Sequence, residues 1–372
     1  MLNTTDKSWQ ECAERVILYT DSYLDFEGGY NPGGRQRHIR DLAMVVREWG
    51  RDVLVVQKGT HDFENTCPAG IPVIGIKSNL SAKGDFRFSR ASRGVAKRGD
   101  VWLYASGENA WPYFAENSKA IQHGIWWDGP QKLVTRLIQR QRALEMMRST
   151  KSVFCVDTNF INWIRGQGPT GYELSKKCQY ISNYADLDKV IPTIRTSAGP
   201  LSLVIARRFE HKRGIIIFVD ALARLSHMGI DFTAQICAIG GKDQVRERVI
   251  FHDLQGVVSV TEETMDSVLN VYKKHHIAVV PTLWSEGTSL ACIEAIVAGL
   301  PVVVSPVGGL GNLVIPGFNG VIINPEPQAL ATAIADIWTG GTWQRMHQNC
   351  LSMREAFGID QWRLRVLAWL KT

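Results

Sequence analysis

Two glutamates stand eight residues apart in the segment Glu286-Gly-Thr-Ser-Leu-Ala-Cys-Ile-Glu294, and this spacing suits a ligand with a phosphate and a ribose. Thr288 or Ser289 can cap a helix that begins near Leu290. Free backbone N–H groups at these three residues would meet a phosphate at the positive end of the helix dipole. At about 1.5 Å rise per residue, Glu294 lies roughly 7 Å further along the helix. Glu294 could therefore accept both hydroxyls of a ribose, while Glu286 would face the other end of the ligand.

The flanking sequence predicts the elements that position this pair. Ile277-Ala-Val-Val-Pro281 is typical of a short strand that stops at a proline. Apolar residues at helical spacing follow Ser289 as far as Gly299, and Val302–Val304 predicts the next strand. Strand, loop, helix and strand form the βαβ unit of a parallel sheet. Taken alone, two such glutamates are more often an exposed loop acid and a solvated helix residue.

A second βαβ pattern near the start of the chain carries a glycine-rich loop. Residues 15–20 predict a strand, residues 27–34 (Glu-Gly-Gly-Tyr-Asn-Pro-Gly-Gly) a loop, and residues 53–57 the next strand after an intervening helix. Gly33 and Gly34 stand where this helix starts, so the backbone there could approach a phosphate closely. The glycines could equally serve only to turn the chain.

Further candidate residues follow two other predicted strands. His123 ends a short strand over residues 119–123, at the carboxyl end where parallel α/β sheets place ligand contacts. A lone histidine is more often structural. The tryptophans of the Trp126-Trp127-Asp128 segment behind it could stack on the ring of an acceptor, or could equally belong to the core.

Four cations follow the predicted strand that opens the second half of the chain, over residues 201–206. They are Arg207, Arg208, Lys212 and Arg213, and a helix begins after them near Ile215. Cations at such an edge predict a diphosphate clamp. No metal site is predicted, since the chain has no H-E-x-x-H motif and no cluster of His with Asp or Glu at ligand spacing.

Length and composition predict a large soluble enzyme. A chain of 372 residues exceeds one typical core, so two domains are expected, and 45% hydrophobic with 21% charged residues is typical of globular proteins. No apolar run has membrane-spanning length, and residues 1–15 lack the apolar core of a signal peptide. We therefore expect a cytoplasmic location. The seven scattered cysteines are interpreted as reduced thiols.

The net charge of +6 is concentrated in the first half of the chain. Residues 77–151 hold 14 Lys and Arg against 6 Asp and Glu. Such a face could attract a phosphorylated acceptor, anionic lipid headgroups or nucleic acid, or could be a solvated helix surface. Within residues 133–148, arginines alternate with leucines as in an amphipathic helix that lies on a membrane, although ordinary core helices look similar. We favour peripheral contact with the inner face of a membrane over nucleic-acid binding.

The segment from Glu286 to Glu294, with Ala-Gly-Leu-Pro-Val-Val behind it and Gly308-Gly309 after it, resembles the donor site of retaining nucleotide-sugar glycosyltransferases of family 4. The match extends over residues 277–340. By this resemblance Glu286 contacts hydroxyls of the donor sugar and Glu294 holds the ribose. The resemblance also places two backbone segments close to the diphosphate and sugar. They are Thr288-Ser289-Leu290 and the turn Gly308-Gly309.

Other parts of the chain resemble the same family. Gly33 and Gly34 match the loop that packs against the donor diphosphate, and His123 matches the histidine that bonds the donor sugar near the scissile bond. The family also has an arginine followed five residues later by a lysine and then a glycine. Here the pair is either Arg208 with Arg213 or Arg207 with Lys212, and the sequence leaves both open.

The resemblance implies two Rossmann-like domains that face each other across a cleft, the GT-B fold. Residues 1–195 would bind the acceptor, residues 196–356 would bind the donor, and a last helix over about residues 357–372 would cross back to the first domain. The implied catalytic residues are His123, Glu286, Arg208 and Arg213, with Arg207 and Lys212 among those that bind the donor.

The predicted reaction is transfer of a sugar from a nucleotide-diphosphate donor to an acceptor hydroxyl, with retention at the anomeric carbon. No cofactor or metal ion is expected, because the cations can neutralise the leaving diphosphate. The acceptor would be a glycan, a lipid-linked saccharide or another hydroxyl compound of polysaccharide or glycoconjugate assembly. Two alternatives remain open, namely a nucleotide-sugar epimerase of the same architecture and a non-catalytic subunit that binds nucleotide sugars.

Overall fold

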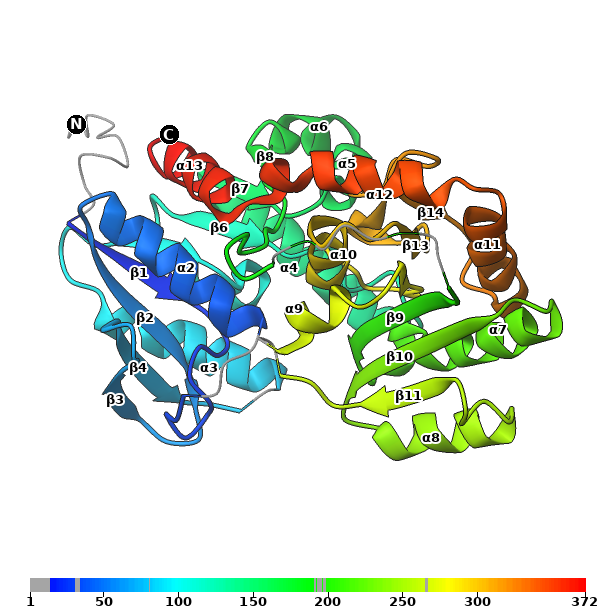
Figure 1. The fold of residues 1–372 in the computed structure, drawn as a ribbon. Coiled ribbons are helices and arrows are strands. Elements are labelled where there is room, and N and C mark those ends of the chain that lie inside the picture. Colours follow the sequence, from blue (N-terminus) through cyan, green and yellow to red (C-terminus); the bar gives the residue numbers. More distant parts are fainter. Residues whose placement is uncertain are drawn as a thin grey trace. The chain divides into compact units, whose positions relative to one another are not determined.

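The computed structural model describes residues 14–30, 34–79, 81–190, 192, 196, 199–264 and 267–372, which form two compact α/β units (Figure 1). The first unit contains Met1–His123, Pro130–Ile181 and Arg363–Thr372. The second contains Gly124–Gly129 and Ser182–Trp362. None of the helices formed by the described residues is long and apolar enough to cross a lipid bilayer.

The first unit is built on an eight-stranded sheet with the order β3-β4-β2-β1-β5-β6-β7-β8. Its strands are β1 (Arg15–Tyr19), β2 (Asp52–Gly59), β3 (Phe63–Thr66), β4 (Pro72–Lys77), β5 (Val101–Tyr104), β6 (Lys119–Gln122), β7 (Ser152–Cys155) and β8 (Cys178–Tyr180). Neighbouring strands are parallel except β3 and β4 at the edge. The central strands are continuous apolar runs because helices cover both faces of a parallel sheet.

Helices connect these strands. They are α2 (Gly34–Glu48), α3 (Ala82–Ser92), α4 (Leu133–Ser149), α5 (Thr158–Arg165) and α6 (Gly168–Ser175), with short 3₁₀ segments η1 (Arg93–Val95) and η2 (Gly107–Ala110). Two helices begin at side-chain caps. Ser81 accepts a hydrogen bond from the backbone N–H of Gly84, and Asp157 accepts one from Phe160.

The last helix, α13 (Ile359–Leu370), ends in the first unit. The ring of Trp369 lies 5.2 Å from that of Phe154 in an edge-to-face contact. The buried Lys119 on β6 donates from Nζ to the carbonyl oxygen of Trp369 at 2.6 Å and to that of Leu370 at 3.3 Å. The carbonyl of Trp369 also accepts from the N–H and the Oγ1 of Thr372, whereas Lys119 is the donor recorded for the carbonyl of Leu370, so Lys119 completes the cap of α13.

The second unit has a six-stranded, wholly parallel sheet with the order β11-β10-β9-β12-β13-β14. Its strands are β9 (Leu201–Arg208), β10 (Phe232–Ile239), β11 (Val258–Thr261), β12 (Ile277–Val280), β13 (Val302–Val304) and β14 (Gly320–Ile322). Its helices are α7 (Ile215–His227), α8 (Lys242–Phe251), α9 (Ser267–Tyr272), α10 (Leu290–Val297), α11 (Pro327–Thr339) and α12 (Trp343–Ser352), with η3 (His211–Arg213), η4 (Gly308–Asn312) and η5 (Arg354–Phe357).

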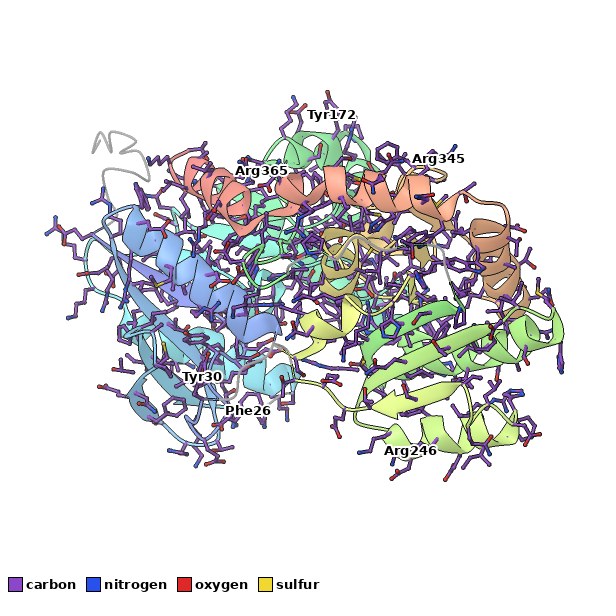
Figure 2. The ribbon with its side chains drawn as sticks, viewed as in Figure 1. Phe26, Tyr30, Tyr172, Arg246, Arg345 and Arg365 are labelled. Atoms are coloured by element: carbon purple, nitrogen blue, oxygen red, sulfur yellow. The ribbon has the colours of Figure 1, made fainter. Side chains whose placement is uncertain are left out.

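Two separate cores cover the faces of this second sheet. Alternate side chains of β9 point in opposite directions, so Leu203 and Ile205 join the core beneath α7 and α11, whereas Val204 joins the core beneath α10. Exposed side chains point outward from the helices. Figure 2 shows this for Arg246 on α8 and for Tyr172 on α6.

The structure confirms the predicted fold class of two parallel α/β domains. The strands expected at residues 277–281 and 302–304 and the helix between them are present, as are the βαβ pattern at the start of the chain and the final helix. The six cysteines that the structure describes are free thiols, and Cys12 lies outside the described residues.

Candidate functional site

Glu286 is a buried carboxylate held by three donors. Its Oε2 accepts hydrogen bonds from Arg207 Nη2 at 2.5 Å, from Arg213 Nη1 at 2.5 Å and from Thr282 Oγ1 at 2.8 Å. Burial acts to raise the pKa of Glu286, but the charges of Arg207 and Arg213 and the bond from Thr282 outweigh it, so the pKa lies below its ordinary value. Glu286 is therefore a fixed negative charge at neutral pH.

The residues around Glu286 come from the carboxyl ends of neighbouring strands. Arg207 is the second-to-last residue of the strand β9, and Thr282 follows β12, which pairs with β9. Arg213 lies in η3, directly before Gly214. Gly214 has φ +71°, and a Cβ there would stand 2.1 Å from the carbonyl oxygen of Pro281, so this close passage of η3 over β12 requires glycine. The parallel sheet thus gathers these groups at its ligand-binding edge.

The start of α10 is joined to Glu286 through Arg207. Ser289 is the cap residue, and its Oγ accepts a hydrogen bond from the N–H of Cys292 at 3.4 Å, so the predicted capping is confirmed. The same Oγ accepts from Arg207 Nη1 at 2.7 Å. Nδ2 of Asn183 donates to the carbonyl of Thr288 at 2.8 Å, which fixes the chain that leads into Leu290.

Gly308 and Gly309 lie against the backbone of Glu286. The N–H of Gly309 donates to the carbonyl of Glu286 at 3.4 Å. Gly308 has φ +54°, and a Cβ on it would stand 1.7 Å from that carbonyl oxygen. No other residue fits at position 308 without moving the Glu286 loop. The structure therefore brings the predicted Gly-Gly turn and the predicted glutamate together.

Glu294 is buried within the second turn of α10, with only 4% of its surface exposed. Burial, followed by the charge of Glu294, raises the pKa of Tyr272 well above its ordinary value. The alternative that Glu294 is a solvated helix residue is wrong. A carboxylate with this degree of burial needs polar partners, which a polar ligand such as a ribose can add to.

The four cations after β9 have different surroundings. Arg207 is buried, whereas Arg208, its neighbour on the strand, is exposed. Arg213 is 19% exposed at its side chain and Lys212 is 22% exposed. Nζ of Lys212 lies 3.3 Å from Glu210 and 5.5 Å from the ring centre of Trp126. The structure therefore brings Arg207 together with Arg213, a combination that neither of the two sequence registers contained.

Burial also affects the guanidinium of Arg213. Burial lowers its pKa from the ordinary value, and the charge of Glu286 opposes that shift. The guanidinium remains charged at any ordinary pH because an arginine titrates so high. Arg213 thus presents a partly exposed cation beside the buried carboxylate.

The segment Gly124–Gly129 packs on the loop before Glu286. The carboxylate of Asp128 accepts from the backbone N–H of Ser285 at 3.0 Å and from its Oγ at 3.0 Å. Ser285 has φ +56°, an unfavourable conformation for a residue with a side chain, so Asp128 stabilises a strained turn. The sequence allows Trp126 and Trp127 either to stack on an acceptor ring or to belong to the core; Trp127 is buried and Trp126 is exposed. The role of Asp128 has no local sequence signal. No sequence spacing connects residues 128 and 285.

The first unit holds the other predicted residues. His123 follows β6, its Nε2 is paired with the carbonyl oxygen of Ala105 at 2.9 Å, and its ring centre lies 5.2 Å from that of His38 on α2. Burial, followed by the charge of His123, lowers the pKa of His38 well below its ordinary value. Gly34 opens α2, so the structure brings His123 to the helix that Gly34 starts. Gly33 lies outside the described residues.

Within the part of the chain that the structure describes, no group of three or more His, Cys, Asp or Glu side chains is arranged to hold a metal ion. Independence from metal ions stays a prediction.

Comparison with known proteins gives a consistent result. The family model described as glycosyl transferases group 1 matches residues 200–339, which include Arg207, Glu286 and Glu294. A glycogen synthase of Mycobacterium tuberculosis is 30% identical over 354 residues, which cover 82% of this chain and 82% of that protein.

Solved structures share the fold. The sucrose-phosphate synthase tll1590 of Thermosynechococcus elongatus has a TM-score of 0.75 at 19% identity and covers 95% of this chain and 97% of its own. Anabaena Alr3699/HepE in complex with UDP and glucose has a TM-score of 0.73 at 17% identity and covers 96% of this chain and 99% of its own.

Proposed function

The chain belongs to the glycosyl transferases of group 1, and we propose that it moves a sugar from a nucleotide-diphosphate donor to an acceptor hydroxyl with retention of the anomeric configuration. The observation that carries this proposal is the buried Glu286, held by Arg207 and Arg213 beside the start of α10. The fixed carboxylate provides a partner for the sugar, and the helix start and a partly exposed cation provide partners for the diphosphate of the same ligand.

In this proposal the donor binds to the second unit. The N–H groups of Thr288, Ser289 and Leu290 meet the diphosphate at the start of α10, where the helix dipole is positive. Arg213 and Lys212 are the two partly exposed cations available to it. Glu294 accepts the ribose hydroxyls. That Anabaena Alr3699/HepE was solved with UDP-glucose supports this class of donor.

Arg207 is then a positioning residue. Its guanidinium is bonded to Ser289, Thr282 and Glu286 and is buried, so it aligns the helix start with the carboxylate.

Glu286 orients the sugar and does not attack it. Its Oε2 is already bonded by two guanidinium groups and a hydroxyl, which lowers its reactivity as a nucleophile. Retention then follows from front-face transfer, in which the C1–O bond to the leaving phosphate breaks through an oxocarbenium-like state. The oxygen of the acceptor hydroxyl bonds to C1 from the same face, its proton passes to the leaving phosphate oxygen, and His123 contacts the sugar. Arg213, Lys212 and the helix start stabilise the charge that develops on the diphosphate.

The test is to incubate the purified protein with UDP-, GDP-, dTDP- and ADP-sugars and to measure nucleotide release with and without an acceptor extract. Acceptor-dependent release from one donor is expected, and the product's anomeric coupling in NMR should match that of the donor. Glu294→Gln should weaken binding of that donor at least tenfold. Release that is equal without acceptor, or an inverted product, would contradict the proposal.

The cellular role that fits is assembly of a polysaccharide or glycoconjugate, with peripheral contact to an anionic membrane surface. Four apolar side chains of α4 are exposed, namely Leu133 (66%), Val134 (67%), Leu137 (51%) and Ile138 (47%), and Lys132 precedes them. Such a face can lie among lipid headgroups. Sedimentation with phosphatidylglycerol vesicles should fall when Leu133 and Leu137 are changed to Ser. Equal sedimentation of this variant would exclude the contact through α4.

A further inference from the structure

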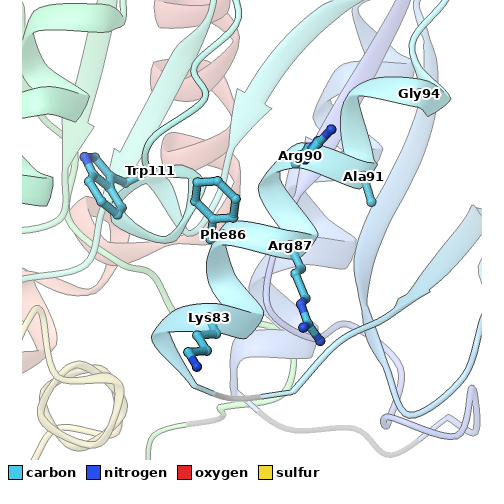
Figure 3. A pocket seen from close by; sticks show the side chains of 7 residues that line it. All are labelled: Lys83, Phe86, Arg87, Arg90, Ala91, Gly94 and Trp111. Carbon is cyan, nitrogen blue, oxygen red and sulfur yellow. The ribbon is translucent and has the colours of Figure 1, made fainter.

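A surface cavity of about 860 Å³ lies on the first unit, outside the residues assigned above. Five of its lining residues, Lys83, Phe86, Arg87, Arg90 and Ala91, are on α3 (Figure 3). Trp111, which follows η2, faces Phe86 across the cavity. The cavity thus combines cations and aromatic rings.

The cations form one ridge of α3. Lys83, Arg87 and Arg90 are spaced four and three residues apart, so they share one helix face over about 10 Å, and all three are exposed. None of them forms an ion pair with any residue that the structure describes. Like charges at this spacing repel one another and destabilise a helix, and bound acid groups would offset that repulsion.

The one carboxylate of α3 faces away from this ridge. Asp85 binds the buried Lys58 through Oδ1 at 2.5 Å and Arg142 of α4 through Oδ2 at 2.7 Å. The acid that could neutralise the ridge is therefore committed to the interior. The cavity keeps an excess of positive charge.

The aromatic walls are fixed in place. Ser89 donates from Oγ to the carbonyl oxygens of Ala110 and Tyr113, which ties α3 to the segment that carries Trp111. The guanidinium of Arg142 lies 5.4 Å from the ring centre of Trp111. The ring of Phe86 lies 5.5 Å from that of Tyr113. Rings held in this way can pack against the apolar face of a sugar.

We propose that this cavity binds an acidic oligosaccharide, the chain whose hydroxyl accepts the transferred sugar. This proposal rests on the proposed function. Charges spread over about 10 Å of helix fit a chain with repeated carboxylate or phosphate groups better than a single anion. Phe86 and Trp111 contact the sugar rings, and Lys83, Arg87 and Arg90 bind the acid groups. Because α3 starts just after the carboxyl end of β4, the cavity begins at the same edge of the sheet as His123.

The test compares two charge-removing double variants. Arg87→Ala with Arg90→Ala removes two cations of the cavity. Lys97→Ala with Arg98→Ala removes two exposed cations of the same unit that do not line it. Calorimetry measures binding of tri-galacturonic acid, of a phosphorylated maltotriose and of neutral maltotriose.

We expect at least one acidic trisaccharide to bind more than tenfold better than maltotriose. The cavity variant should lose at least tenfold of that affinity and the control variant less than twofold. Thermal melting of both variants should match that of the wild-type protein, since all four side chains are exposed. Failure of both acidic probes to bind, equal binding of maltotriose, or equal losses in the two variants would overturn the proposal.

Sugar transfer separates this proposal from the proposed function. With an acidic acceptor the cavity variant should show a raised KM for the acceptor, with kcat and the KM for the donor unchanged. Transfer with equal acceptor KM in both variants would remove the cavity from the reaction and leave the proposed function intact. Binding without transfer from any donor would contradict the proposed function and leave the cavity as a binding site.

Discussion

At the scale of single residues, the buried Glu286 and its two arginines stabilise one another through their opposite charges. Arg207 is buried, so loss of the carboxylate would leave a buried guanidinium without its counter-charge. Removing one partner of such a pair typically costs about 3–5 kcal/mol. We therefore expect Glu286→Gln to lower the free energy of unfolding of the second unit by about 3 kcal/mol at pH 7, measured by urea denaturation.

The pH dependence of this loss has a definite sign. The pKa of Glu286 is lowered in the folded protein, so its stabilisation is present above the unfolded value of 4.5 and is lost as pH falls through the folded value. The difference between the wild-type protein and Glu286→Gln should therefore shrink below pH 4.5. A difference that stayed constant down to pH 3 would show that the ion pairs do not stabilise the fold.

Glu108 of η2 should show the opposite dependence on pH. Burial raises its pKa to about 7, although a hydrogen bond from Gln122 and the charge of Arg142 oppose the shift. The protonated Glu108 therefore stabilises the folded protein fully below pH 4.5, and this stabilisation is lost as pH rises through about 7. The variant Glu108→Gln keeps an acceptor for Gln122 and stays neutral. We compare the free energy of unfolding of the variant with that of the wild-type protein, measured by denaturation at pH 5 and at pH 8. The difference in favour of the variant should be on the order of 2 kcal/mol larger at pH 8.

Arg213 and the metal requirement can be tested together. If Arg213 and Lys212 neutralise the leaving diphosphate, transfer should persist in excess EDTA. Loss of one preorganised charge partner typically costs about 10²–10³ in kcat. We expect that loss for Arg213→Ala, and less than tenfold for the exposed Arg208→Ala, in a steady-state assay. Activity abolished by EDTA and restored by Mg²⁺ would show that a metal ion carries the charge instead.

At the scale of elements, the segment Gly124–Gly129 acts as a brace for the loop that presents Glu286. Asp128 accepts two hydrogen bonds from Ser285, whose positive φ costs about 1 kcal/mol for a residue with a Cβ. We expect Asp128→Ala to weaken donor binding about tenfold, measured by calorimetry, because the turn relaxes.

A second substitution checks the cause of this effect. Glycine adopts φ +56° without strain, so Ser285→Gly in the Asp128→Ala background should recover part of the lost affinity. No recovery would indicate that Asp128 acts directly on the ligand and not through the turn.

At the scale of the whole molecule, the sequence was sufficient to predict those elements and site residues whose positions follow from local pattern and sheet topology. The βαβ pattern over residues 277–304 predicted two strands, a cap at Thr288 or Ser289 and the loop of Glu286, because each follows from periodicity and cap chemistry. Parallel strands bring their carboxyl ends to one edge, so the proximity of the cations to this loop was also predictable.

What the sequence could not predict depends on individual backbone angles and distant contacts. The orientation of the last two residues of β9 decides whether Arg207 or Arg208 points inward. The 3₁₀ segment η3 then brings Arg213 to Glu286. The bond between Asp128 and Ser285 joins positions 157 residues apart. Likewise, the basic stretch at residues 77–151 did not reveal that Asp85 faces inward and leaves the ridge of α3 positive.

The last prediction concerns α13, which ends the chain in the first unit. Lys119 is buried on β6, and its Nζ also donates to Oγ1 of Thr372 at 3.1 Å, besides the carbonyls of Trp369 and Leu370. Methionine has a similar length but no donor, so Lys119→Met leaves the carbonyl of Leu370 without this donor at a cost of about 1–3 kcal/mol, while the carbonyl of Trp369 keeps its bonds from Thr372. We expect faster hydrogen exchange in peptides that cover α13 and β7, with β9 and β12 unchanged.

Faster hydrogen exchange confined to Thr372 would contradict this role of Lys119, because the final residue can fray without loss of an anchor. A matched control is Lys177→Met, since Nζ of Lys177 also donates to backbone carbonyls, those of Met147, Arg148 and Thr150, and these lie at the end of α4. Its variant should loosen the end of α4 and leave α13 protected. If both variants opened α13 equally, the effect would reflect general weakening of the first unit, and the anchoring of α13 would have to be assigned to the packing of Trp369 on Phe154 alone.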